Sequence, residues 1–273
     1  MVILIYRREP TYASRRPGET LEKTRRRGLT SVRISMGALF TALVALATMA
    51  FSVYIPATRG YFNIGEVMVY TTAILLGSKI GAFAGGVGSM LSDILLGYSI
   101  FAPATLVIKA IEGGLVGFLT NRGLKFGSKN SWKAFTTAIG LIVATIIGYL
   151  GITRYTGSVE LTIGLPYVGS TLLAFEVPSI FWIVVSVIVA VLVSSIGFLY
   201  DPQLGWTMLS VLAGGTIMVF GYFAYEVYLY GGVAAASVEV PANVGQAVIG
   251  LLVGLPLSQL ILRRAPVLKR LIL

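Results

Sequence analysis

Residues 60–119 read GYFNIGEVMVYTTAILLGSKIGAFAGGVGSMLSDILLGYSIFAPATLVIKAIEGGLVGFL. This stretch holds three closely spaced apolar runs, each about long enough to cross a membrane. Four charged residues interrupt the runs, namely Glu66, Asp93, Lys109 and Glu112. Because a charge is costly inside hydrocarbon, such residues usually face a protein interior or a water-filled cavity. The stretch therefore predicts packed membrane helices that enclose a polar pocket.

The whole chain has a membrane-like composition. Of its 273 residues, 56% are hydrophobic and 12% are charged. Apolar runs of membrane length predict eight helices, at about 32–55, 62–78, 80–97, 103–121, 132–154, 177–200, 206–229 and 243–262. We therefore expect an all-α membrane protein.

Lysine and arginine are distributed unevenly around these helices. If the helices alternate in direction, all Lys and Arg residues except Arg59, Arg154 and the intramembrane Lys109 fall on one side. Such enrichment marks the cytoplasmic side of a membrane. The chain is thus expected in the cell membrane with both termini in the cytoplasm. The net charge of +10 needs no nucleic-acid partner to explain it.

Several kinds of chemistry are excluded by composition. The chain has no Cys and no His, which rules out thiolate catalysis, disulfides and imidazole acid–base chemistry. It also lacks the pattern G-x-x-x-x-G-K-[ST] of an ATP-binding P-loop. We expect no cofactor, no metal site and no enzymatic activity.

Composition divides the chain into four parts. Residues 1–31 form a basic tail, expected to be cytoplasmic and disordered. Residues 32–122 hold the first four predicted helices, and residues 206–273 hold the last two with a basic C-terminal end. The two helices within residues 123–205 are rich in Ile, Val and Leu, with no ionisable residue in the core of either. They are interpreted as a peripheral pair inserted into a six-helix core.

Three fragments in this order resemble the S components of energy-coupling factor (ECF) vitamin transporters, in particular the riboflavin-transporter-like group. They are residues 60–119, GYFAYEVYLYG at 221–231 and EVPANVGQAVIG at 239–250. The resemblance implies a membrane subunit that captures a vitamin or vitamin precursor from outside. It also implies partners, namely a transmembrane T component on which the subunit docks and two cytosolic ATPases that drive import.

The resemblance further implies a docking surface on the first helix. In the family, small residues four positions apart contact the T component, and Ala38 and Ala42 have this spacing. Small residues allow two helix backbones to approach closely. Packing within the subunit is the alternative role of these residues.

Candidate substrate-binding residues are polar or aromatic and lie mostly toward the outer ends of the predicted helices. Together they offer donors, acceptors and both signs of charge, which suits a heteroaromatic solute that must leave water. The candidates are Asn63, Glu66, Lys109, Glu112, Tyr222, Glu226, Asn243 and Gln246.

Some of these residues have structural alternatives. Asp93 and Lys109 lie at similar depths and are predicted to form an ion pair between the third and fourth helices. Asn63 and Glu66 have the spacing of a helix-capping box. Asn243 follows Pro241 and could cap the last helix.

The sequence is compatible with more than one solute. Some riboflavin binders of the family hold the flavin with Asn-x-x-Lys in the last helix, whereas this chain has Asn243-x-x-Gln246. A flavin, a thiamin precursor or a similar heterocycle is therefore considered. A self-sufficient secondary carrier is the alternative function, although no convincing inverted repeat is found. An intramembrane enzyme is disfavoured because no acidic pair of the D-x-x-D type occurs.

Overall fold

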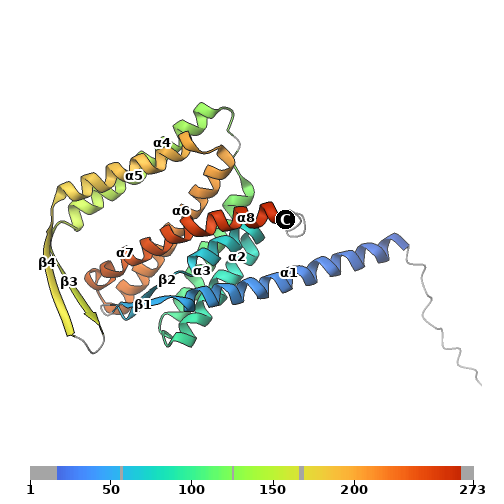
Figure 1. Cartoon of the computed structure of the whole chain (residues 1–273), viewed down its shortest axis with the longest axis horizontal. Helices are drawn as coiled ribbons and strands as arrows, with labels where there is room; N and C mark the ends of the chain where they lie inside the picture. Colours follow the sequence, from blue (N-terminus) through green and yellow to red (C-terminus); the bar gives the residue numbers. More distant parts are fainter. Residues whose placement is uncertain (1–16, 56–57, 125, 166–168, 266–273) are drawn as a thin grey trace, which may run out of the picture.

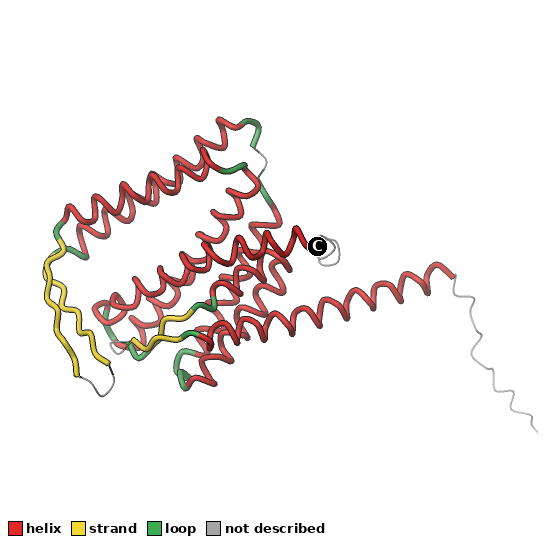
Figure 2. Tube along the Cα trace, viewed as in Figure 1, coloured by secondary structure: helices red, strands yellow, loops and turns green. Residues whose placement is uncertain are grey.

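The computed structural model describes residues 17–55, 58–124, 126–165 and 169–265. These residues form a helical bundle with two short β-hairpins (Figures 1 and 2). The elements are α1 (Pro17–Ala50), β1 (Ser52–Ile55), β2 (Gly60–Asn63), α2 (Glu66–Leu96), α3 (Ala102–Arg122), α4 (Lys129–Arg154), β3 (Gly157–Leu165), β4 (Gly169–Val177), α5 (Ser179–Leu199), α6 (Pro202–Tyr230), α7 (Val233–Ile249), a π-helical turn η1 (Gly250–Gly254) and α8 (Leu255–Arg264). In the described part of the chain, seven helices are long and apolar enough to cross a membrane. The prediction of an all-α membrane protein is confirmed.

Helix α2 contains a sharp reversal at Gly77. Gly77 has φ 79° and ψ −175°, a backbone conformation open essentially to glycine alone. A Cβ atom placed on Gly81 would lie 2.9 Å from the Cα atom of Ala73, and one on Gly85 would lie 3.3 Å from Val69 Cγ1. In a straight helix, residues eight apart are separated by about 12 Å. The two arms of α2 therefore pack antiparallel, and the seven helices account for the eight predicted segments.

The glycine pattern of the sequence explains how closely α2 and α3 pack. A Cβ atom on Gly113 would lie only 2.4 Å from the Gly81 carbonyl oxygen, and one on Gly117 would lie 2.6 Å from the Gly77 carbonyl carbon. Backbones can approach this closely only where side chains are absent. This contact brings Glu66, on the first arm of α2, close to α3.

Helix α1 differs from its predicted bounds, and it is followed by a hairpin that was not predicted from the sequence. Helix α1 begins at Pro17, within the tail expected to be disordered, and its first half extends beyond the bundle (Figure 1). It ends at Ala50, because residues 52–55 pair with β2 in an antiparallel hairpin that joins Tyr54 to Tyr61. Residues 1–16 lie outside the described residues.

Helices α4 and α5 lie side by side at the edge of the molecule, away from α1, α2 and α3 (Figure 1). Trp132 on α4 anchors the pair, because its indole donates to the Tyr200 carbonyl oxygen at 3.2 Å and its ring packs with Ile196 and Leu209. Many aliphatic side chains of the pair are exposed, which is expected of helices that face lipid. Examples are Leu141, Ile142, Val187, Val191 and Leu192.

The last predicted helix begins earlier in the structure. Helix α7 starts at Val233, includes Pro241 and continues through η1 into α8. Membrane helices tolerate an internal proline because neighbouring groups satisfy the freed backbone. The interpretation of Asn243 as an N-cap is therefore wrong, and residues before Asn243 become part of a helical face.

Candidate functional site

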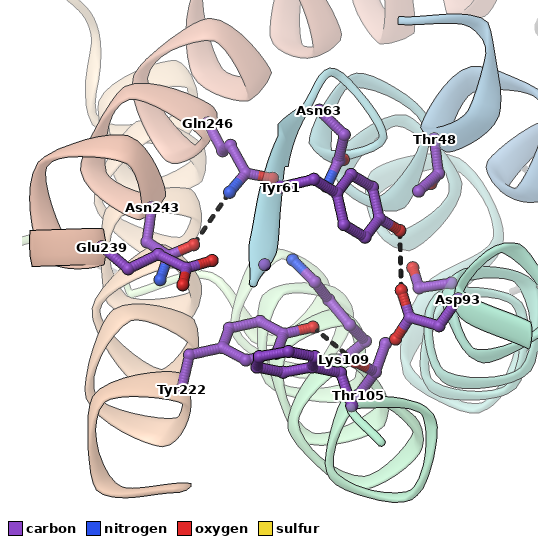
Figure 3. A pocket seen from close by; sticks show the side chains of 13 residues that line it. Thr48, Tyr61, Asn63, Asp93, Thr105, Lys109, Tyr222, Glu239, Asn243 and Gln246 are labelled. Atoms are coloured by element: carbon purple, nitrogen blue, oxygen red, sulfur yellow. Dashed lines mark hydrogen bonds between the residues drawn. The ribbon is translucent and has the colours of Figure 1, made fainter. Parts of the chain in front are cut away.

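A polar pocket lies at one end of the bundle, where α1, β2, α2, α3, α6 and α7 meet (Figure 3). On α1, Arg33 lies 15 residues before the pocket residue Thr48, and Arg263, in the last turn of α8, lies 17 residues after the pocket residue Gln246. The pocket is lined by Thr48, Gly60, Tyr61, Asn63, Ser89, Asp93, Phe101, Thr105, Lys109, Tyr222, Glu239, Asn243 and Gln246. The convergence of side chains from separate helices, expected from the sequence, is present.

Lys109 is held between two carboxylates. Its Nζ atom donates to Glu66 Oε1 and lies 3.1 Å from Glu112 Oε2. Tyr70 donates a further hydrogen bond of 2.7 Å to Glu112 Oε1. All three charged side chains are almost completely buried. Pairing of this kind is what allows charges to remain away from water.

Asp93 has a different partner from the one predicted. Tyr61 donates a hydrogen bond of 2.6 Å to Asp93 Oδ1, whereas the ion pairs of Lys109 in the described chain are with Glu66 and Glu112. Burial and the adjacent Asp93 raise the pKa of Tyr61, so its phenol keeps the proton that it donates. Tyr61 also stacks on Tyr98, with ring centroids 4.3 Å apart. The predicted Asp93–Lys109 ion pair is therefore not formed.

Helices α6 and α7 supply the opposite wall of the pocket. Gln246 Nε2 donates to Asn243 Oδ1 at 2.8 Å, which leaves the Asn243 amide hydrogens and the Gln246 carbonyl oxygen for other contacts. Tyr222 donates to Thr105 Oγ1 at 3.0 Å, and its ring centroid lies 5.6 Å from Lys109 Nζ. Asn63 Oδ1 accepts from the Gly65 amide at 2.9 Å, while Glu66 turns to Lys109 instead of completing a capping box.

Two further carboxyl groups, Glu226 and Glu239, interact with each other across the α6–α7 connection. Both are buried, with 0% and 5% of their surface exposed. Neither oxygen of Glu226, nor Oε2 of Glu239, has a hydrogen-bond donor in the described chain. The Glu239 carboxyl packs against Gly60, where a Cβ atom would lie 2.4 Å from Oε1. Glycine at position 60 thus lets this carboxyl reach the pocket wall.

The predicted site residues fall into two layers. Five of them line the pocket, namely Asn63, Lys109, Tyr222, Asn243 and Gln246. Three lie behind it and contact lining residues, namely Glu66, Glu112 and Glu226. Sequence reasoning missed Glu239 and Tyr61 as lining residues. Glu239 precedes Asn243 by four positions, so a helix extended back through Pro241 would have placed both on one face.

One side of the small-residue face of α1 packs against α2, and the other side is exposed. Thr41 and Ala45 are buried against α2, where a Cβ atom on Gly88 would meet the Thr41 carbonyl oxygen at 2.7 Å. Ala38 and Ala42 are exposed on the outer surface. Internal packing therefore occupies one side of the stripe and leaves the other side open.

Relatives with curated descriptions match parts of the chain. A Pyrococcus woesei protein, described only as an uncharacterized protein in the gap 3' region, is 39% identical over 109 residues, which are 40% of this chain and 70% of that protein. The thiamine precursor transporter HmpT of Lactococcus lactis is 28% identical over 95 residues, which are 34% of this chain and 57% of HmpT. The chain thus spans little more than half the length of the relative whose solute is named.

The family comparison covers more of the chain. The model of the ECF-type riboflavin transporter S component matches residues 28–171, from α1 through α4 into β4. It runs through α4 without a break, so the insertion of the α4–α5 pair into an older core stays a prediction. The match includes more than half of the 273 residues. The chain therefore belongs to the ECF-type riboflavin transporter S component family, as a multi-pass, non-enzymatic membrane subunit of a vitamin or vitamin-precursor transporter.

Proposed function

We propose that this chain captures a vitamin-like heterocycle from outside the cell and imports it as the substrate-specific subunit of an ATP-driven ECF transporter. A T component would hold it in the membrane complex, and two cytosolic ATPases would supply the energy. Both termini would face the cytoplasm, since alternation of the membrane helices along the sequence puts most of the Lys and Arg residues on one side of the membrane.

One observation carries this proposal, namely the polar pocket at one end of the bundle, which would be the outer end if the Lys- and Arg-rich side is cytoplasmic. Side chains from β2, α3, α6 and α7 converge there, and each can replace hydrogen bonds that a solute loses on leaving water. Aromatic rings of Tyr61, Phe101 and Tyr222 supply flat apolar surface for a ring system. A heteroaromatic solute of the vitamin class suits this combination.

The exposed face of α1 supports the part of the proposal that concerns docking on a T component. Ala38 and Ala42 lie four residues apart on α1, and both are exposed outside the packed core. A helix of a T component could approach the α1 backbone closely at this surface. Nearby, an apolar groove between α1 and the Gly77 turn is lined by Gly37, Ala38 and Phe83.

The test is solute uptake with and without the partners. The chain would be expressed in a host that lacks vitamin uptake, alone or together with a T component and two ATPases, and radiolabelled riboflavin and thiamin-precursor uptake would be measured. We expect uptake only in the complete set, and none when the ATPases carry an inactive P-loop. Sustained uptake by the chain alone, driven by a proton or sodium gradient, would instead support a secondary carrier.

A second experiment can identify the solute without a set of candidate compounds chosen in advance. Small molecules that co-purify with the detergent-solubilised chain would be identified by mass spectrometry, with Gln246→Ala as the pocket variant and Gln203→Ala, at the distant start of α6, as the control. We expect a heterocycle that is depleted only in the Gln246 variant. Equal retention by both variants would place the bound molecule elsewhere.

A further inference from the structure

The groove between α1 and the turn at Gly77 is separate from the polar pocket, because none of its described lining residues lines that pocket. It holds about 630 Å³ of space, a size typical of small-ligand sites. The lining is largely apolar, and its charged residues are Arg33 and Lys79. From this combination we infer that the groove binds an anionic phospholipid, with the phosphate at Arg33 and Lys79 and an acyl chain along the apolar part. The inference goes beyond the proposed function, because it concerns a lipid and not the solute.

The charged and apolar parts of the groove follow each other in the same order on both helices. Arg33 precedes Gly37 on α1 by four residues, and Lys79 precedes Phe83 on α2 by four residues, which is about 6 Å along each helix axis. Both helices then run on to the polar pocket, where each contributes lining residues. The two bases therefore lie at the end of the groove that is farther from the pocket. A phospholipid has the same order, a charged headgroup followed by acyl chains.

The two bases have no acid to neutralise them in the groove. No carboxylate is among its described lining residues, and the ion pairs within the described ranges are those of Lys109. Arg33 and Lys79 are both exposed, so a ligand can reach them. A phosphate suits such a pair, since Arg binds it through two parallel N–H groups and Lys as a point charge. Basic sites between membrane helices on the cytoplasmic side are typical headgroup sites of anionic lipids.

The apolar part of the groove favours a lipid over a water-soluble phosphate compound. Ile34 and Phe83 are 66% and 57% exposed on its two sides. Between them Gly37 leaves room, because a Cβ atom there would meet Ile80 Cγ2 only at 3.9 Å, an ordinary contact distance. In a membrane-spanning segment a surface of this kind meets acyl chains, and a concave surface contacts a chain on more sides than a flat one does. A soluble phosphate compound would use the bases alone.

The test measures lipid binding to the delipidated full chain by native mass spectrometry. The probes are phosphatidylglycerol and phosphatidylcholine with identical acyl chains, so the two lipids differ in headgroup charge alone. We expect the first phosphatidylglycerol to bind at least tenfold more tightly than phosphatidylcholine. Because this comparison uses the unmodified chain, it does not depend on the folding of a variant. Equal affinities of the two lipids would overturn the inference.

Variants then assign the preference to the two bases. Each basic side chain near an anionic lipid contributes roughly fivefold in affinity, so Arg33→Gln with Lys79→Gln should weaken phosphatidylglycerol binding at least tenfold and leave phosphatidylcholine unchanged. The matched control is Arg263→Gln with Arg264→Gln, which removes the same charge at exposed positions of α8 outside the groove. Equal losses in the two double variants would show attraction to the net charge alone and would overturn the site.

Crosslinking locates the acyl chain. Phosphatidylglycerol with a photoreactive diazirine in one acyl chain would be added to the unmodified chain in nanodiscs, and the labelled peptides would be identified by mass spectrometry. We expect labels within residues 34–38 and 80–83, which excess unlabelled phosphatidylglycerol removes and phosphatidylcholine does not. Labels confined to other helices would overturn the inference. Removal of the labels by soluble glycerol 3-phosphate at the same concentration would assign the bases to a free phosphate compound and would overturn it as well.

Discussion

The hydroxyl group of Tyr61 donates a hydrogen bond of 2.6 Å to Asp93 Oδ1, which ties the β1–β2 hairpin to the second arm of α2. The same two residues line the pocket. The hairpin is thus fixed at the pocket wall by a contact between strand β2 and a membrane helix.

Tyr61→Phe should weaken both the hairpin and solute binding. The substitution leaves the buried Asp93 without its phenol donor, which typically costs about 1–3 kcal/mol. We expect a lower unfolding temperature in detergent and at least a severalfold weaker affinity for the co-purifying solute. Tyr54→Phe is the control, because Tyr54 is exposed on the neighbouring strand. Equal effects of the two substitutions would contradict a specific role for the Tyr61–Asp93 bond.

Lys109→Met should be severely destabilising. It removes the cation from between Glu66 and Glu112, and breaking a buried ion pair from one side costs about 3–5 kcal/mol. Thermal unfolding would measure the loss, with Lys79→Met as the control at an exposed position. The triple variant Lys109→Met, Glu66→Gln and Glu112→Gln should recover much of the stability. Failure to recover would mean that shape, and not charge, limits this part of the bundle.

Gly113→Ala should separate α2 from α3. The added methyl group would lie 2.4 Å from the Gly81 carbonyl oxygen, a backbone atom that cannot turn aside. Overpacking of this kind costs about 1–3 kcal/mol. Gly127→Ala is the matched control, because its Cβ atom would have no neighbour within 4 Å. Unfolding temperatures that fall equally in both variants would argue against the close approach.

Ala38→Leu together with Ala42→Leu should uncouple binding from uptake. The two bulky side chains would keep a T component from the α1 backbone, and the pocket would stay intact because Ala38 and Ala42 are exposed and do not line it. We expect unchanged solute affinity of the isolated chain and at least a tenfold loss of uptake in the complete transporter. Ala224→Leu introduces the same side chain at an exposed position of α6. Uptake lost in that control as well would point to a general effect of bulk in the membrane.

The sequence predicted the helices well because membrane length and hydropathy determine them almost alone. The sequence also predicted that five polar or aromatic residues lie at one end of the bundle, because helix direction and depth follow from the order of the segments. These residues are Asn63, Lys109, Tyr222, Asn243 and Gln246. These residues all line the pocket in the structure.

The specific partners could not be predicted in this way. Depth alone could not decide whether Lys109 would meet Asp93 or Glu66, because that choice depends on the turn at Gly77 and on how closely α3 approaches. Glu239 was missed because Pro241 was taken to mark a helix start. In a soluble protein that assumption is usually sound, but a membrane bundle can satisfy the backbone around an internal proline.

The reversal at Gly77 has a mechanical consequence. Both arms of α2 leave the same tight turn, and one begins at Glu66 behind the pocket while the other carries Asp93 in its wall. A displacement of this turn would therefore move two sides of the pocket together. Gly77 thus links two sides of the pocket wall through one backbone turn, although it lies at the far end of each arm from Glu66 and Asp93.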